Sequence, residues 1–131
     1  MVESFEISEV IPATPRQIYE AWLSSKGHAE MTGGPADIDP SVGGKFSMFG
    51  GVIYGQTLEM EPHSRIVQSW RAGEFPEGSP DSRIEVLLEE APGGAKLTIQ
   101  HSNIPDGQAE GYKQGWEEHY FQHMQEHFGK S

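Results

Sequence analysis

The chain has 131 residues, of which 20 are aspartate or glutamate and nine are lysine or arginine, and its formal net charge is −11. This length is enough for one hydrophobic core and too short for two, so we expect a single domain over residues 1–131. The negative charge repels phosphate backbones and anionic membrane surfaces, so we expect no nucleic-acid partner and no membrane partner. The absence of cysteine excludes disulfides, thiolate catalysis and cysteine-ligated zinc.

No segment approaches the roughly 18 consecutive apolar residues that a membrane span requires. The N-terminal residues, MVESFEISEV, have neither the basic start nor the apolar stretch of a secretory signal peptide. We therefore expect a cytoplasmic location.

The first elements are predicted to be a strand followed by two short helices. Apolar and polar residues alternate over residues 4–11, which is the period of a half-buried strand. Thr14 can then cap a helix, Pro15 suits its first position and Gln17 completes a capping box. A second short helical turn is expected over residues 28–31.

From residue 43 onwards, short alternating runs are separated by turn residues, a pattern typical of a meander of antiparallel strands. Gly50 and Gly51 offer a two-residue hairpin turn between the first two of these strands. The expected strands of the meander cover residues 46–48, 52–60, 66–71, 84–88 and 97–101. With the N-terminal strand, the sequence predicts about six strands.

After Pro105 the pattern changes to that of a helix and stays helical to the end of the chain. Asp106 can cap this helix, and apolar residues then recur at spacings of three and four, as one helix face requires. The residues of this face are Ala109, Tyr112, Trp116, Tyr120 and Met124. The order of strand, helix pair, strands and long helix predicts an α+β domain in which the helix covers one face of a curved antiparallel sheet.

Three stretches carry a resemblance to a known family: ATPRQIYEAW, GGKFSMFGGVIYGQTLEMEPHSRIVQSWR and IPDGQAEGYKQGWEEHYFQHMQEHFG. The chain resembles the activator-of-heat-shock-protein-90-ATPase homologue family, in the form of the domain at the C-terminus of the eukaryotic co-chaperone. This family is part of the START-related, birch-pollen-allergen-like superfamily (SRPBCC). The resemblance implies a helix-grip fold with a cavity between sheet and helix, where many relatives hold apolar ligands.

The resemblance also implies heat-shock protein 90 as a partner. The eukaryotic co-chaperone has a separate N-terminal domain that makes the principal chaperone contact, and 131 residues leave no room for it. We therefore expect this chain alone to stimulate the ATPase of heat-shock protein 90 weakly or not at all.

Strand alternation and helix phase select a set of residues that face the space between sheet and helix. As ligand-binding residues we predict Phe46, Met48, Tyr54, Trp70, His101, Tyr112, Trp116 and His123. Each aromatic member has the alternative of an ordinary core role. His101, in phase with Leu97 and Ile99, is predicted to be buried, either as a satisfied core histidine or as a polar anchor for a ligand.

Three further histidines lie four residues apart on the last helix. His123 and His127 are in phase with Trp116, so we expect them to face inward near His101, at a polar end of the core or in contact with a ligand. Together with His119, these two histidines form one stripe along the helix. Two histidines four residues apart can chelate a metal ion through their imidazole nitrogens. No third ligand stands at a defined spacing, so we expect no metal site.

Catalytic motifs are not found. No GxSxG elbow is present, the glycine pairs lie at turns, and paired glutamates such as Glu89 and Glu90 are typical of solvated faces. We expect no catalytic residues and no cofactor.

The leading hypothesis is a non-enzymatic binding module that holds a small apolar or amphipathic molecule. The alternatives are a stress-linked co-chaperone or protein-interaction module that contacts heat-shock protein 90 and, more weakly supported, a cyclase-like or hydrolase-like SRPBCC enzyme. Exposed strand edges permit a weak homodimer without requiring one, so we expect a monomer or a weak homodimer.

Overall fold

The computed structural model describes residues 2–129, which form one seven-stranded sheet packed against helices on one face. The strand order is β1-β7-β6-β5-β4-β3-β2, and every neighbouring pair is antiparallel. The strands are β1 (Glu3–Ile11), β2 (Ala36–Ile38), β3 (Lys45–Met48), β4 (Ile53–Glu61), β5 (Arg65–Ala72), β6 (Ser82–Ala91) and β7 (Gly94–Ile104). The short strand β2, which extends the sheet beyond β3, was not predicted.

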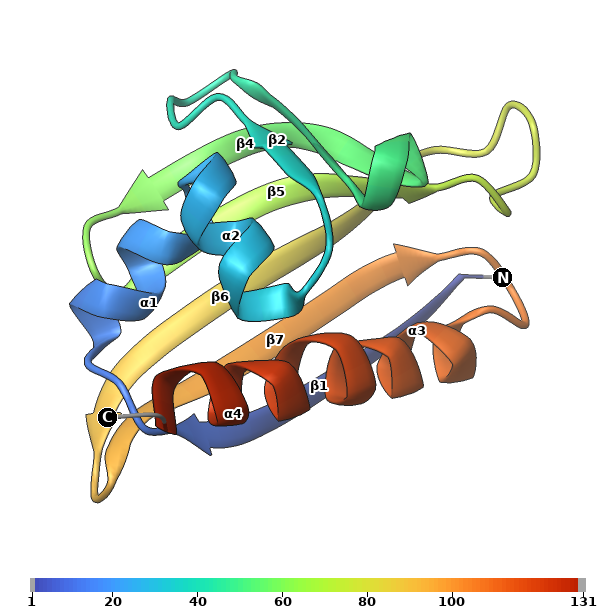
Figure 1. Ribbon diagram of the computed structural model, residues 1–131. Coiled ribbons are helices and arrows are strands. Elements are labelled where there is room, and N and C mark those ends of the chain that lie inside the picture. Colours follow the sequence, from blue (N-terminus) through green and yellow to red (C-terminus); the bar gives the residue numbers. More distant parts are fainter. Residues whose placement is uncertain (1, 130–131) are drawn as a thin grey trace.

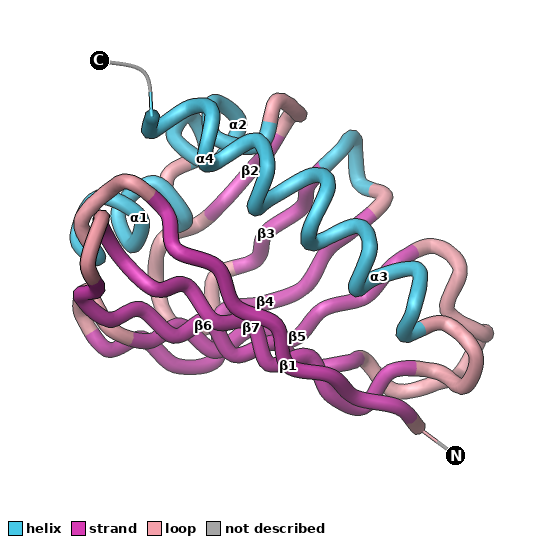
Figure 2. The backbone as a smooth tube through the Cα atoms, turned by 90° about the horizontal axis from the view of Figure 1, so that it is seen from below, coloured by secondary structure: helices cyan, strands magenta, loops and turns pink. Residues whose placement is uncertain are grey.

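Two short helices follow β1, and a long helix ends the chain (Figure 1). Its three segments are continuous from Ala109 to Gly129, and Figure 2 shows this helix lying across one face of the sheet. The helical segments are α1 (Pro15–Trp22), α2 (Ser25–Thr32), the 3₁₀ turn η1 (Phe49–Gly51), α3 (Ala109–Gly115), the π-helical segment η2 (Trp116–Phe121) and α4 (Gln122–Gly129). The predicted α+β helix-grip fold is confirmed.

The short helices begin where local chemistry satisfies their free backbone groups. The Thr14 hydroxyl accepts from the Gln17 backbone N–H, and the Gln17 side chain accepts from the Thr14 N–H, which is the predicted capping box. At the start of α2, the Ser24 hydroxyl accepts from the Gly27 backbone N–H and caps the helix. Gly33 ends α2 in the left-handed conformation that glycine adopts without strain.

The register of β4 corrects one prediction, the inward position of Tyr54. Tyr54 pairs with Ser47, which points away from the core because its neighbours Phe46 and Met48 are buried. Tyr54 is therefore on the outer face, with 45% of its surface exposed. Tyr54 and Leu58 are both exposed on the outer face of the sheet, so the apolar character of these residues indicated the wrong face.

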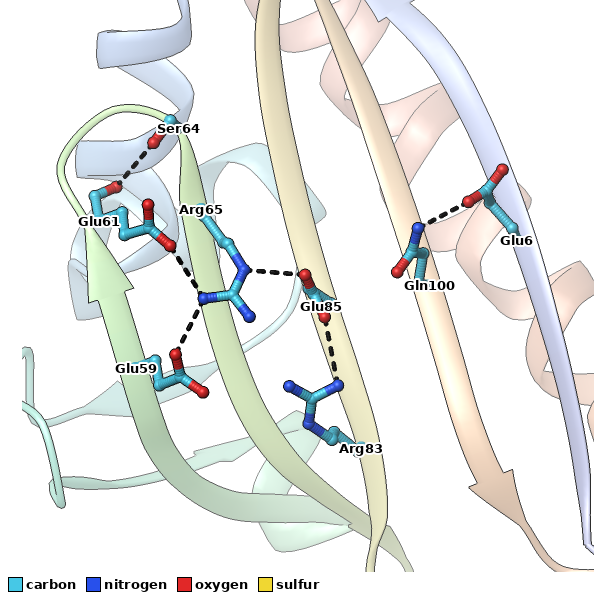
Figure 3. A network of polar contacts seen from close by, with 8 residues as sticks. All are labelled: Glu6, Glu59, Glu61, Ser64, Arg65, Arg83, Glu85 and Gln100. Carbon is cyan, nitrogen blue, oxygen red and sulfur yellow. Dashed lines mark hydrogen bonds and ion pairs between the residues drawn. The ribbon is translucent and has the colours of Figure 1, made fainter.

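The outer face of the sheet carries a polar network between strands (Figure 3). Arg65 lies at its centre, with its guanidinium 2.9 Å from carboxylate oxygens of Glu59 and Glu61 and 2.8 Å from Glu85. Arg83 adds a second contact to Glu85 at 3.2 Å. The Arg65 guanidinium holds the pKa of the Glu85 carboxyl below its ordinary value. This face of the sheet is exposed to solvent, and the opposite face packs against the core.

The core occupies the space between the inner face of the sheet and the helices. Because the sheet is apolar on that face, burying it against the helices provides most of the driving force for folding. Its most buried members include Trp22, Met31, Ile66, Ile84, Leu97, Ile99, Trp116, Tyr120 and Met124. In the part of the chain that the structure describes, no helix is long and apolar enough to cross a membrane.

Candidate functional site

A cleft of about 440 Å³ opens between the C-terminal helix and the side of the sheet formed by β4 and β5. Two of the elements that line it, the turn η1 and the helix α3, are coloured green and orange in Figure 1. Its lining comes from η1, β4, β5, α3, η2 and the loops that follow β5 and β7. The lining residues are Phe49, Ile53, Trp70, Glu74, Gly107, Gln108, Gly111, Tyr112, Gly115, Trp116, His119 and Tyr120.

Four aromatic side chains form one continuous part of this lining. The ring centroids of Trp70 and Tyr112 are 4.9 Å apart, and those of Trp70 and Trp116 are 6.0 Å apart. Trp116 and Tyr120 follow at 4.6 Å. Their planes are inclined at 72°, 39° and 51°, in the tilted and edge-to-face arrangements that aromatic pairs prefer. Periodicity predicted this position for three of them; their contact with a ligand stays a prediction.

Three glycines four residues apart keep the helix side of the cleft open. Gly107, Gly111 and Gly115 all line it. A Cβ atom added at Gly107 or Gly111 would meet nothing within 4 Å, and one added at Gly115 would meet only a carbon of His119 at 3.9 Å. Close packing does not require glycine at 111 or 115, whereas Gly107 precedes the helix with a φ of 83°, which glycine adopts without strain. The lack of side chains at all three positions leaves space beside the aromatic rings.

Phe49 lies at the rim of the cleft in a strained backbone conformation. Its φ of 56° is in the left-handed region, which is costly for a bulky residue. Its ring packs so closely on Gly34 that a Cβ there would collide with it. The His119 ring lies 6.3 Å from that of Phe49 between centroids. A residue in a strained conformation thus contributes an aromatic ring to the cleft lining.

The polar groups of the cleft are few. The Tyr112 hydroxyl donates to Oε1 of Gln108 at 2.6 Å, and Nε2 of Gln108 donates to the backbone oxygen of Glu74 at 3.0 Å. Burial, with a smaller contribution from the Glu74 charge, raises the pKa of Tyr112 to about 12. Among the described residues, Nε1 of Trp70 has no hydrogen-bond partner, and neighbouring side chains cover it.

His101 lies behind the aromatic lining and is fully buried, as predicted. Its Nδ1 accepts from the indole N–H of Trp116 at 3.1 Å, so the proton of the neutral ring is on Nε2. Nε2 donates to the Ser82 hydroxyl at 2.9 Å, and that hydroxyl donates to the Trp70 carbonyl at 2.6 Å. Burial lowers the pKa of His101 to about 3. Both ring nitrogens are engaged by the protein.

A second buried histidine, which sequence reasoning did not select, supports the same lining from α2. Nδ1 of His28 donates to the Trp22 carbonyl at 2.9 Å, so Nε2 accepts from the Tyr120 hydroxyl at 2.6 Å. Burial lowers the pKa of His28 to about 4. The sulfur of Met48 also lies 2.8 Å from that hydroxyl. Met48 and Phe46, both predicted as ligand-binding residues, are buried core residues outside the lining of the cleft.

The expected inward positions of His123 and His127 are wrong. Both are exposed, and His123 lies beside Gly33 at the end of α2. The π-helical segment η2 has wider turns than an α-helix, so every later residue is rotated out of the phase that an α-helix predicts. Within residues 2–129, no three histidine or carboxylate side chains lie close enough together to hold a metal ion.

Comparison with known proteins places this arrangement in a family. A family model described as "Activator of Hsp90 ATPase homolog 1-like protein" matches residues 12–129. Activator of 90 kDa heat shock protein ATPase homolog 1 of Homo sapiens is 28% identical over 123 residues, which are 94% of this chain and 36% of that protein. The Dictyostelium discoideum homolog is 25% identical over 98% of this chain and 34% of its own length. The chain spans about a third of the length of these curated relatives.

Solved structures agree with this assignment. An HSP90 activator from Plasmodium falciparum superposes with a TM-score of 0.86 at 29% identity, covering 96% of each chain. CalU16 from Micromonospora echinospora has a TM-score of 0.81 at 23% identity, covering 98% of this chain and 78% of that chain, which shows the shared fold alone. The match over nearly the whole chain, together with the helix-grip fold, shows that the protein belongs to the Activator of Hsp90 ATPase homolog 1-like family.

Proposed function

We propose that this protein is a non-enzymatic binding module that holds a small apolar or amphipathic molecule in the cleft beside the C-terminal helix. The observation that carries the proposal is the cleft itself, about 440 Å³ in volume and lined mainly by aromatic side chains. This volume lies in the range of roughly 300–1,000 Å³ that is typical of small-molecule sites. Aromatic walls offer a large apolar contact area, which favours an apolar or amphipathic occupant.

Two local irregularities support the same location. The glycines at 111 and 115 leave the helix side open, although glycine inside a helix costs about 1 kcal/mol relative to alanine. The π-helical segment, a form often found at functional sites, begins at Trp116 and contains Tyr120, two of the lining residues. Both irregularities lie where the helix lines the cleft.

We propose that the protein binds its ligand without catalysing a reaction. The buried histidines are the side chains best suited to proton transfer, and both use their ring nitrogens for contacts within the protein. The lining offers a single carboxylate and a single imidazole, those of Glu74 and His119, both exposed. Neither a nucleophile with an adjacent base nor a pair of inward carboxylates supports a reaction among the lining residues.

The test is native mass spectrometry of the protein purified from its own cells, in which a retained ligand adds mass. Gly115→Leu should remove that added mass, because the new side chain takes up space in the cleft. Gln122→Leu is the matched control, since it adds the same side chain to an exposed position of the same helix outside the cleft. A bound molecule that both variants retain equally would place binding elsewhere and contradict the proposal.

Contact with heat-shock protein 90 is a second candidate function. It is supported by the 29% identity, over 96% of both chains, to a protein described as an HSP90 activator. Because the chain corresponds to only 36% of the human homolog, we expect weaker stimulation of the ATPase than a full-length relative gives. A titration of this chain against the heat-shock protein 90 of its own cells tests this. Saturable, several-fold stimulation would favour this second function over a purely ligand-binding role.

A further inference from the structure

The charge of the cleft lining selects among amphipathic ligands. We infer that the ligand is an amphipathic cation, with an apolar body against the aromatic rings and an ammonium-type head near Glu74. This inference rests on the proposed function and adds the charge of the ligand. The lining residues in the described part of the chain include one carboxylate, that of Glu74, and no lysine or arginine.

Aromatic faces attract cations in addition to apolar groups. The π-electrons of tryptophan and tyrosine stabilise a nearby ammonium group by about 0.5 to 2 kcal/mol, more as the group loses water. The ring centroids of Tyr112 and Trp116 lie 4.9 Å and 6.0 Å from that of Trp70. Trp70 and Trp116 are almost fully buried, so Tyr112, the least buried of the three, offers the most ring surface to a head group.

The polar groups that remain free at the cleft surface are mainly acceptors. The Tyr112 hydroxyl has given its only proton to Gln108, and the Gln108 amide donates to the Glu74 backbone, so the oxygen of Tyr112 and the Glu74 carboxylate are left to accept. The indole N–H of Trp70 is covered by its neighbours and offers no donor there. The neutral imidazole of His119 can donate or accept a hydrogen bond. An anionic head group would be repelled by the Glu74 carboxylate, and no lysine or arginine of the lining would offset this repulsion.

The inference is tested with three probes that share a decyl chain and differ in the head: decyltrimethylammonium, decanol and decyl sulfate. Each is titrated below its micelle concentration, with tryptophan fluorescence and calorimetry as readouts, at a pH of about 8 where imidazoles are neutral. We expect decyltrimethylammonium to bind about tenfold more tightly than decanol, and decyl sulfate more weakly than decanol.

Charge-matched variants separate the cleft from the general acidity of the protein. Glu74→Gln should lower the affinity for decyltrimethylammonium several-fold and leave that for decanol unchanged. Glu77→Gln, which removes the same charge from an exposed residue of the same loop outside the lining, should change neither. Equal effects of the two variants would mean a non-specific attraction and would overturn the inference.

Failure of the inference can be distinguished from failure of the proposed function. If decanol binds and Gly115→Leu abolishes its binding, but the three heads bind equally or the sulfate binds best, the inference is wrong and the binding module stands. If no probe binds, or if Gly115→Leu leaves all binding unchanged, both are wrong.

Discussion

The indole nitrogen of Trp116 donates a hydrogen bond of 3.1 Å to Nδ1 of His101, which connects the C-terminal helix to strand β7 of the sheet. The bond fixes the neutral tautomer of the histidine, and through Ser82 the connection continues to the backbone of β5. Trp116, at one end of this connection, lines the cleft, and His101 lies in the core. The position of a cleft wall therefore depends on a buried hydrogen bond.

Trp116→Phe should lower the free energy of unfolding more than Trp70→Phe does. The first substitution removes a donor and leaves Nδ1 of His101 unpaired in the core, at a cost of about 1 to 3 kcal/mol beyond the loss of packing. Trp70 is similarly buried, but its indole nitrogen has no partner to lose. Urea unfolding of both variants measures the difference, and equal losses would show that packing alone explains the effect.

The protein should lose stability as the pH falls from 7 to 5. Burial lowers the folded-state pKa of His101 to about 3 and that of His28 to about 4, so the unfolded chain binds more protons over this interval. Above the ordinary histidine pKa of about 6.5, both states are neutral and the full stability is present. Below it, acid protonates the histidine of the unfolded chain alone, and each histidine should lower the free energy of unfolding by about 2 kcal/mol by a pH of about 5.

Urea midpoints measured across this interval check the effect. His101→Gln should reduce the dependence on pH by about half, because glutamine does not titrate. His127→Gln, at an exposed position, is the control and should leave the dependence unchanged. A dependence that the His101 variant retains in full would contradict the assignment to buried histidines.

Removing residues 106–131 should abolish cooperative unfolding. The helix that starts at Ala109 covers the apolar face of the sheet, and without it residues such as Ile99 and Leu97 would face water. Thermal melting followed by circular dichroism and calorimetry tests this expectation. A sharp transition in the shortened chain would show that the sheet and the two short helices form a core on their own.

Two glycine-to-alanine substitutions should change stability in opposite directions. Gly111→Ala places a methyl group in open space and improves helix propensity, so it should stabilise the protein by about 0.5 to 1 kcal/mol. Gly27→Ala brings the methyl group to within 2.9 Å of the Ala21 backbone, so it should destabilise the protein. Differential scanning calorimetry compares the two melting temperatures, and destabilisation by Gly111→Ala would show that the open space is needed for the fold.

Local signals predicted most of the fold, because capping residues, alternation and helix periodicity are written in short stretches of sequence. Thr14 and Gln17 form the predicted capping box, and the face containing Tyr112 and Trp116 lies where its spacing places it. The strand β2 was missed because Ala36–Ile38 is too short to show alternation and depends on pairing with β3.

The candidate site was less predictable, because its errors come from features without a local signature. The π-helical segment changes the phase after Trp116, so His123 was assigned inward although it is exposed. Tyr54 lies outside because of its register with β3. Phe49 and Glu74 enter the cleft from a turn and a loop, and only the folded chain brings them near α3. Besides the aromatic face that contains Tyr112 and Trp116, the regular spacing of glycines 107, 111 and 115 was a further signal that could have marked the helix side of the cleft.

The free edge of β1 has a consequence for the behaviour of the protein at high concentration. Beyond β7 the sheet ends at this nine-residue strand, whose outer side faces no other strand, although the Val10 N–H and carbonyl are hydrogen-bonded to the side chains of Glu9 and Gln125. Glu3, Glu6 and Glu9 lie along it, so a second sheet edge of the same kind would bring several carboxylates close together. This charge protects the edge against pairing with a second copy, so the acidic residues of the strand act against aggregation at high concentration.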